Sequence, residues 1–299
     1  MNVTEKDLKK IRNILMKNKI TTAGAIKYLG RQGSSKTVIF NGDDHVGSQY
    51  ALSSPNPVRS DGLQVMPTKQ MSALYKIWET LPDKLTKKRA NVWLVNGEPI
   101  DGVARRNTAV WTNSASDQIE DFIKCMKTFS YDHLLFTRGS PFHVDIDGTN
   151  FEEMTARAMN ADAYKTYGGS GLTDYECNFE VFGKVINATH HVGFSGWQQY
   201  RPTSLARELV KMHFEHGKRR VHTDILARSH VHYYCQVKFT HAEAFSTPAW
   251  KLPDPHFYKG GLPQMPDIGL IEAVIEPNGD YEINPIIEDI DIEPMVRHF

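Results

Sequence analysis

The 299-residue chain carries 35 basic and 35 acidic side chains and therefore has no formal net charge at pH 7. Dedicated nucleic-acid-binding proteins usually show a basic excess, because neutralisation of phosphates drives their affinity, so any nucleic-acid contact must come from a local patch. The hydrophobic content of 40% and the charged content of 23% are ordinary for a folded protein and exclude a largely disordered chain.

Cysteine spacing and apolar runs indicate the compartment. Cys125, Cys177 and Cys235 are widely separated and form no Cys-x-x-Cys pair, which argues against a disulfide framework or a thiolate zinc site. No apolar run approaches the length of a membrane-spanning helix, and the charged N-terminal sequence lacks the apolar region of a signal peptide. We therefore expect a cytoplasmic protein without a membrane partner. The sequence indicates no oligomeric state.

Residues 1–32 are expected to form a helical appendage to a single domain of residues 33–299. Leu8, Ile11 and Leu15 recur at helical spacing, and a second short segment ends at Gly30. The two segments could form an amphipathic arm packed on the domain or half of a helix-turn-helix. We favour the arm, because periodicity alone does not place side chains on base edges.

From residue 36 onward, apolar strands alternate with amphipathic helices. Strands are predicted over 36–42, 90–97 and 132–139, and helices over 68–81, 116–129 and 151–160. Such alternation is typical of parallel strands covered by helices. After about residue 174 the pattern changes to β-hairpins, with turns at Phe182-Gly183 and Asn278-Gly279 and a long β stretch over 223–240. The sequence predicts one α/β sandwich of two mixed β-sheets flanked by helices.

Five predicted strands end in histidine, carboxylate or hydroxyl side chains. Open α/β sheets bind ligands at the carboxyl edge, so we expect these side chains on one rim. Carboxylate and imidazole without thiolate form a ligand set for hard and borderline divalent cations. The groups in chain order are Asp43 and His45, Glu98 and Asp101, Ser140 and His143, His190 and His191, and His230 and His232.

Residues two apart in an extended segment point the same way, so Asp43 with His45 could chelate one ion, and the imidazoles of His230 and His232 could address one cluster. Each motif also has a structural explanation, because short patterns arise easily in a chain with 13 histidines and 35 acidic residues. A histidine pair could be one core and one surface residue, and an acidic pair could cap a helix. The shared position at strand ends favours a metal site.

The order of these motifs resembles that of the calcineurin-like metallophosphoesterases and is most similar to the type common in bacteriophage genomes. In that type the third motif has the form Gly-Thr-Pro-Tyr-His, to which residues 139–143, Gly-Ser-Pro-Phe-His, are similar. The resemblance covers residues 37–267, including Ser53-Ser54-Pro55 and Pro248-Ala249-Trp250. It implies a metallophosphoesterase-type sandwich of two mixed β-sheets flanked by helices.

The resemblance also implies a dinuclear metal centre that hydrolyses phosphoesters through a metal-activated hydroxide. One ion would be held by Asp43, His45 and His232, and Glu98 would bridge to the second ion. The second ion would also be held by His190 and His230, with Ser140 as a weaker oxygen ligand.

Other residues would serve the reaction or support the ligands. His143 would protonate the leaving oxygen, and Arg138 is a candidate helper or a surface ion-pairing residue. Asp101 and His191 are alternative or supporting ligands. Arg105 and Arg106 could steer a phosphate to the metals or could be a solvated pair in a loop.

Three positions depart from the family pattern. Glu98 stands where the family generally has Asp, Ser140 where it has Asn or Thr, and Ser229 where Gly usually precedes the His-x-His motif. A longer bridging ligand and a poorer oxygen ligand leave the metal identity and the filling of the second site open. We expect two divalent ions, with manganese favoured and Fe, Zn, Ni or Mg as alternatives.

The favoured substrate is a phosphodiester in DNA, RNA or a nucleotide, which would make the protein a phosphodiesterase or nuclease. Local basic stretches at 87–89 and 218–220 support this prediction, as do Trp197, Tyr200 and Tyr233-Tyr234, which could stack on bases. The alternatives are a phosphomonoesterase acting on a nucleotide or phosphoprotein, and an inactive scaffold that retains the fold. A phage-encoded enzyme would act in the host cytoplasm.

Overall fold

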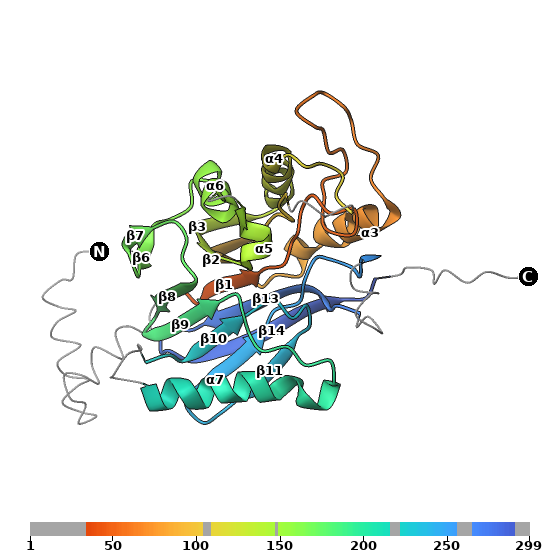
Figure 1. Ribbon diagram of the computed structural model, residues 1–299. Helices are drawn as coiled ribbons and strands as arrows, with labels where there is room; N and C mark the ends of the chain where they lie inside the picture. The colour runs from red at the N-terminus through yellow and green to blue at the C-terminus, as the bar shows by residue number, and fades with distance from the viewer. Residues whose placement is uncertain (1–33, 104–108, 147–148, 216–221, 256–264, 291–299) are drawn as a thin grey trace, which may run out of the picture.

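The computed structural model describes residues 34–103, 109–146, 149–215, 222–255 and 265–290, which contain two five-stranded β-sheets with helices on their outer sides (Figure 1). The predicted sandwich of two mixed sheets flanked by helices is confirmed. The predicted helical appendage over 1–32, Arg105, Arg106 and the basic stretch at 218–220 lie outside the described residues. In the described ranges, no helix is both long enough and apolar enough to cross a bilayer.

The first sheet combines three parallel strands with an antiparallel hairpin. The strands β1, β2 and β3 run parallel, β13 pairs with β1 antiparallel, and β14 pairs with β13 across the predicted turn at Asn278-Gly279. The strand bounds in spatial order are β14 (Tyr281–Glu288), β13 (Ile268–Ile275), β1 (Lys36–Asn41), β2 (Arg89–Asn96) and β3 (Ser130–Thr137).

The second sheet has a parallel centre and antiparallel edges. β9 and β12 both run parallel to β10, whereas β8 and β11 pair antiparallel with their neighbours. The β8–β9 turn has positive φ at Phe182 and Gly183, as a two-residue hairpin turn requires. The strand bounds in spatial order are β11 (Cys235–Lys238), β12 (Glu243–Ser246), β10 (Ile225–Arg228), β9 (Lys184–Thr189) and β8 (Glu176–Val181).

The helices cover the two outer faces of the sandwich (Figure 1). Polar side chains accept hydrogen bonds from the first turns of three helices, as expected of N-caps: Thr68, Ser114 and Asn150. The predicted helices are therefore confirmed as α3 (Lys69–Trp78), α4 (Ala115–Met126) and α6 (Phe151–Ala158) on the first sheet. The remaining elements are α5 (Pro141–Val144), α7 (Arg201–Glu215) on the second sheet, the 3₁₀ turns η2 (Leu81–Asp83) and η3 (Gln198–Tyr200), and the small hairpins β4 (Asp145–Ile146) with β5 (Thr149–Asn150) and β6 (Tyr164–Thr166) with β7 (Gly169–Gly171).

The alternation of side chains along β1 and β2 separates two cores. Val38 and Phe40 point into the core between the sheets, whereas Ile39 points to the core under the helices. Phe40 meets Phe245 of β12 edge-to-face at 5.0 Å across the inter-sheet core. This period of two fixes the register of the strands and therefore the position of the loops that follow them.

One expectation for the C-terminal half is wrong, and one helix there was not predicted. The predicted β stretch over 223–240 is two separate strands, β10 and β11, which lie on either side of β12. The alternating apolar residues Val231 and Tyr233 belong to a loop that packs against α7. Their spacing of two is the spacing expected of a half-buried strand, which is why the loop was predicted as β. The helix α7 was not predicted, although Leu205, Leu209 and Met212 occupy its buried face at helical spacing.

We expect Phe245→Ala to lower the free energy of unfolding by about 3–5 kcal/mol, because it removes a fully buried ring between the sheets. Phe239→Ala is the control, since Phe239 is 45% exposed and its loss should change stability by about 0.5 kcal/mol or less. Urea denaturation of the two variants measures the difference. Equal losses of stability would contradict this assignment of the core.

Candidate metal centre

The loops that follow β1, β2, β9 and β10 are tied together by backbone hydrogen bonds. The amide of Asp43 donates to the carbonyl of Gly97 at 3.1 Å, and that of His45 donates to Glu98 at 3.0 Å. On the other sheet, the amide of Ser229 donates to the carbonyl of His190 at 2.9 Å. The predicted meeting of strand ends at one rim is therefore present in the structure.

The side chains reach this rim through an unusual backbone conformation. Asp43, His45, Glu98, His230 and His232 have φ between 47° and 73°, and they are five of the seven described non-glycine residues with positive φ. The expectation that Asp43 and His45, and His230 and His232, lie in extended segments is wrong. A left-handed residue costs about 1–3 kcal/mol and persists where the surrounding structure holds it, commonly at functional sites.

Glu98 lies at the centre of the group with its two carboxylate oxygens facing different histidines. Oε2 is 2.8 Å from Nε2 of His45, and Oε1 is 3.2 Å from Nε2 of His190. The amide of Ser140 donates to Oε1 at 3.0 Å, and its hydroxyl donates to the same oxygen. The carboxylate is therefore positioned between two sets of imidazoles.

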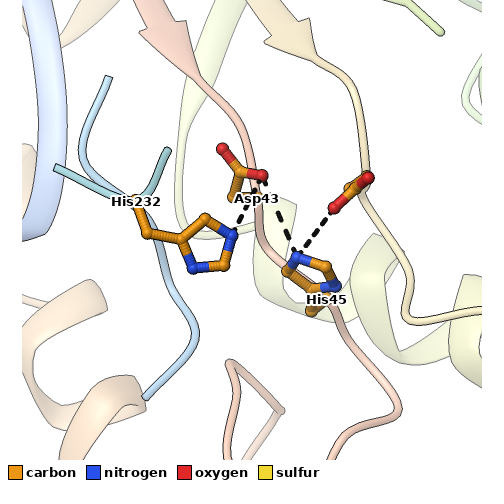
Figure 2. Close-up of side chains that lie close together, drawn as sticks. Asp43, His45 and His232 are labelled. Carbon is orange, nitrogen blue, oxygen red and sulfur yellow. Dashed lines mark ion pairs between the residues drawn. The ribbon is translucent and has the colours of Figure 1, made fainter. Parts of the chain in front are cut away.

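Asp43 joins the histidines of the two sheets. Its Oδ1 is 3.3 Å from Nε2 of His232 and 3.9 Å from Nε2 of His45, and its Oδ2 accepts the amide of His230 at 2.8 Å. Figure 2 shows the side chains of Asp43, His45 and His232 pointing toward one another. All three are buried.

Two groups of ligand-type side chains result, and they share Glu98. Within each group, one ligand atom of every residue lies within 4.8 Å of the others. The groups contain the same histidines and carboxylates that the family resemblance implies for two separate ions. The first is Asp43, His45, Glu98 and His232; the second is Glu98, His190 and His230, beside which Ser140 Oγ lies 3.5 Å from His230 Nδ1.

Hydrogen bonds on the far side of two rings fix their tautomers. Nδ1 of His190 is 2.8 Å from the backbone carbonyl of Asn96, which can only accept, so Nδ1 carries the hydrogen. Nδ1 of His45 faces Oδ1 of Asp101 at 3.1 Å. In the neutral form both rings then direct an Nε2 lone pair at the centre, the arrangement usual for metal-ligating histidines.

Several inward-facing atoms lack hydrogen-bond partners. Among the described residues, Oδ1 of Asp43 and Nε2 of His45 and His190 are buried without one, although each lies within 4 Å of an oppositely charged partner. Buried polar atoms are otherwise nearly always paired. Unpaired carboxylate and imidazole atoms that converge in this way fit divalent cations.

The charges of the cluster are strongly coupled. Burial alone would raise the pKa of Glu98, but His190 and His45 hold it well below its usual range. Burial opposes protonation of His190, yet Glu98 and Asp43 raise its pKa to about 9. Cation binding would therefore displace protons from these imidazoles.

A third group, His45, Asp101 and His143, also has ligand-type atoms close together. Here hydrogen bonds account for the proximity: Nδ1 of His143 donates to the carbonyl of Asp101 at 2.7 Å. The ammonium of Lys251 is 2.9 Å from Oδ1 of Asp101 and would repel a cation at that place. We therefore place no third ion at this group, in which Asp101 positions the rings of His45 and His143.

The other predicted site residues lie at the margin of the cluster. His143 has a partly buried side chain, and burial lowers its pKa. His191 belongs to neither metal-type group, but its ring is 4.7 Å from that of His230. The guanidinium of Arg138 lies 5.4 Å over the ring of Tyr175.

The sequence analysis missed three buried supporting residues. Lys251 pairs with Asp101 and, at 3.4 Å, with Asp254. Oε1 of Glu152 accepts the amides of Gly139 at 3.0 Å and Glu98 at 3.3 Å. The third is Asn96, whose side-chain amide hydrogen-bonds Thr189, Ser229 and Thr137. The position of Lys251 directly after Pro248-Ala249-Trp250, a segment included in the family resemblance, could have indicated its role. No sequence motif distinguishes Glu152 from the other acidic residues in the chain.

No protein-family model and no curated protein matches the chain. Solved structures to which it is similar include a single mutant of Vps29 from Entamoeba histolytica, with 10% identity, 85% of this chain and 99% of that chain covered, and a TM-score of 0.41. An archaeal phosphodiesterase has 10% identity, coverages of 84% and 99%, and a TM-score of 0.39. YfcE, a phosphoesterase from E. coli, has 13% identity, coverages of 81% and 93%, and a TM-score of 0.38. Such low values establish neither a family nor an activity.

Gly97 supplies a test of the cluster geometry. Its φ is +82°, and a Cβ there would overlap the ring of His190, so we expect Gly97→Ala to displace that ring and lower the bound metal. Gly183→Ala is the control, because Gly183 has φ +78° with nothing within 4 Å of an added Cβ. Metal analysis of both purified variants should show a loss in the first alone. Equal metal contents would contradict the position assigned to His190.

Proposed function

We propose that the protein is a metal-dependent phosphoester hydrolase with a dinuclear centre, and that its substrates are phosphodiesters in nucleic acids or nucleotides. The observation that carries the proposal is the division of the two Glu98 oxygens between His45 and His190. A carboxylate in that position can bridge two cations. Manganese is the favoured metal, because imidazole-rich sites suit transition metals, with Fe, Zn, Ni and Mg as alternatives.

Two divalent cations bound there would supply an activated water and neutralise charge on the phosphoryl oxygens. The chain itself holds the site rigid: Asp101 orients His45, and the carbonyl of Asn96 orients His190. The buried walls exclude bulk water from Asp43 and Glu98, which strengthens their interactions with a cation.

His143 is the candidate for proton transfer to the leaving oxygen. Its Nδ1 donates to the carbonyl of Asp101, so proton exchange with a substrate would use Nε2. Because burial lowers the pKa of His143, the negative charge of a bound phosphoester is needed to favour its protonated form. Arg138 follows β3 directly and is a candidate for assisting phosphate binding.

Removal of metal should abolish hydrolysis of bis(p-nitrophenyl) phosphate. Added Mn²⁺ should restore the activity better than Ca²⁺, because Ca²⁺ prefers oxygen ligands and this centre is rich in imidazole. A second assay with p-nitrophenyl phosphate distinguishes the proposed diesterase from a monoesterase. Full activity in excess chelator would refute the metal mechanism, and bound metal without activity on either ester would favour an inactive scaffold.

His143→Ala should retain metal and lower turnover by about 10²–10⁴-fold, the usual contribution of a positioned acid or base. The loss should shrink for a nitrophenolate leaving group, which needs little protonation. His232→Ala is the comparison, because removal of a ligand should reduce metal content and activity on all substrates alike. If His143→Ala loses metal as readily as His232→Ala, His143 is a ligand and not an acid.

A further inference from the structure

The loop between β9 and α7 presents three exposed aromatic rings shortly after His190 and His191. Phe194 is 66% exposed, Trp197 70% and Tyr200 58%; we call these three residues the aromatic loop. The other four of the five tryptophans in the chain are buried. Large rings gathered in the open commonly mark a contact surface.

Hydrogen bonds hold the aromatic loop in a defined shape. The hydroxyl of Ser204 on α7 donates to the carbonyl of Gly193 at 2.7 Å. Within the loop, the amide of Trp197 donates to the hydroxyl of Ser195 at 3.3 Å, and that of Tyr200 donates to the carbonyl of Trp197 at 3.0 Å. A surface that is already ordered loses less conformational entropy when a ligand binds.

The aromatic loop also adjoins the candidate metal centre. The ring of Phe194 is 6.4 Å from that of Tyr233, which directly follows His232 in the chain. Tyr233 itself is only 2% exposed, so the expectation that its ring could stack on a base is wrong. The ring of His191 lies against His230 at 4.7 Å. A ligand with its phosphate at the metal centre could therefore reach the nearest ring of the loop.

A groove of about 520 Å³ begins two residues after Tyr200. Most of its lining residues are apolar and none carries a carboxylate: Pro202, Thr203, Ala206, Arg207, Val210 and Lys211 of α7, and Val237 of β11. Its charged residues are Arg207 and Lys211, one helical turn apart, with Lys211 also 4.0 Å from Glu215 outside the lining. The charge of the groove is complementary to a polyanion.

We propose that the aromatic loop stacks the bases of single-stranded nucleic acid, whose phosphates follow the groove on α7. This inference rests on the proposed hydrolase function and names the substrate class of that site. Every base has a face that can stack on an aromatic ring, so three rings suit successive unpaired bases. The bases of a duplex are already stacked on each other and do not offer those faces.

The test compares a labelled oligothymidylate with an abasic strand of the same length, in chelator so that no cleavage occurs. Fluorescence anisotropy of the full chain measures affinity, and circular dichroism verifies that each protein is folded. Trp197→Ala should weaken oligothymidylate binding about tenfold and leave the abasic strand unaffected, because one stacking contact is lost. Trp197→Tyr should restore most of the affinity.

Two further variants separate stacking from charge. Phe214→Ala is the control, because Phe214 is 73% exposed at the far end of α7, about 20 Å along the helix from Arg201, and should leave binding unchanged. Arg207→Gln should weaken both strands alike and reduce the dependence of affinity on salt, since it removes a phosphate contact.

Equal affinity of the wild type for the two strands would overturn the inference, as would unchanged binding by Trp197→Ala. A Trp197→Ala variant that only shifts the sedimentation coefficient would also overturn it, and would make the loop an interface between copies of the chain. Base-dependent binding without Mn²⁺-dependent hydrolysis of bis(p-nitrophenyl) phosphate would support the stacking surface and reject the proposed function.

Discussion

Asn96 at the end of β2 joins the two sheets at the candidate metal centre. Its amide nitrogen donates to the carbonyl of Thr189 at 3.1 Å and to the hydroxyl of Ser229 at 2.8 Å, both on the second sheet. Its amide oxygen accepts the hydroxyl of Thr137 at the end of β3 at 2.7 Å. Because its own carbonyl also fixes the ring of His190, one buried residue sets both the sheet spacing and a ligand orientation.

The geometry around Asn96 explains why several residues at this rim combine a left-handed backbone conformation with a buried polar side chain. Gly97 turns the chain with positive φ, and its carbonyl accepts the amide of Asp43, so the first two loops share one bend. Left-handed conformations at Asp43, His45 and Glu98 then direct three polar side chains inward. The backbone strain and the burial of the carboxylates both cost free energy, and cation binding would offset these costs.

The sandwich fold and the gathering of the strand-end side chains in one cluster could be predicted from the sequence, because both follow from local patterns. The apolar runs at 36–42 and 90–97 are short and end abruptly in polar residues, which locates both a buried strand and its rim. The left-handed conformation of His230 and His232 could not be predicted, because the alternating sequence His-Val-His is typical of a β-strand. In the structure these residues form a loop whose Val231 packs against α7, a tertiary contact that the local pattern does not indicate. Glu152 and Lys251 act through contacts with residues 54 and 150 positions away, and such pairings are set by tertiary structure alone.

Two of the three residues that depart from the pattern of the resembled family, Glu98 and Ser140, are hydrogen-bonded to each other. The Cγ of Glu98 lies 2.5 Å from where a Cβ of Gly139 would be, so the observed position of this side chain requires glycine at residue 139. The hydroxyl of the neighbouring Ser140 is short enough to donate to Oε1 of the longer carboxylate. The hydrogen bonds from Ser140 therefore help to hold the Glu98 carboxylate between His45 and His190, where its two oxygens face different imidazoles.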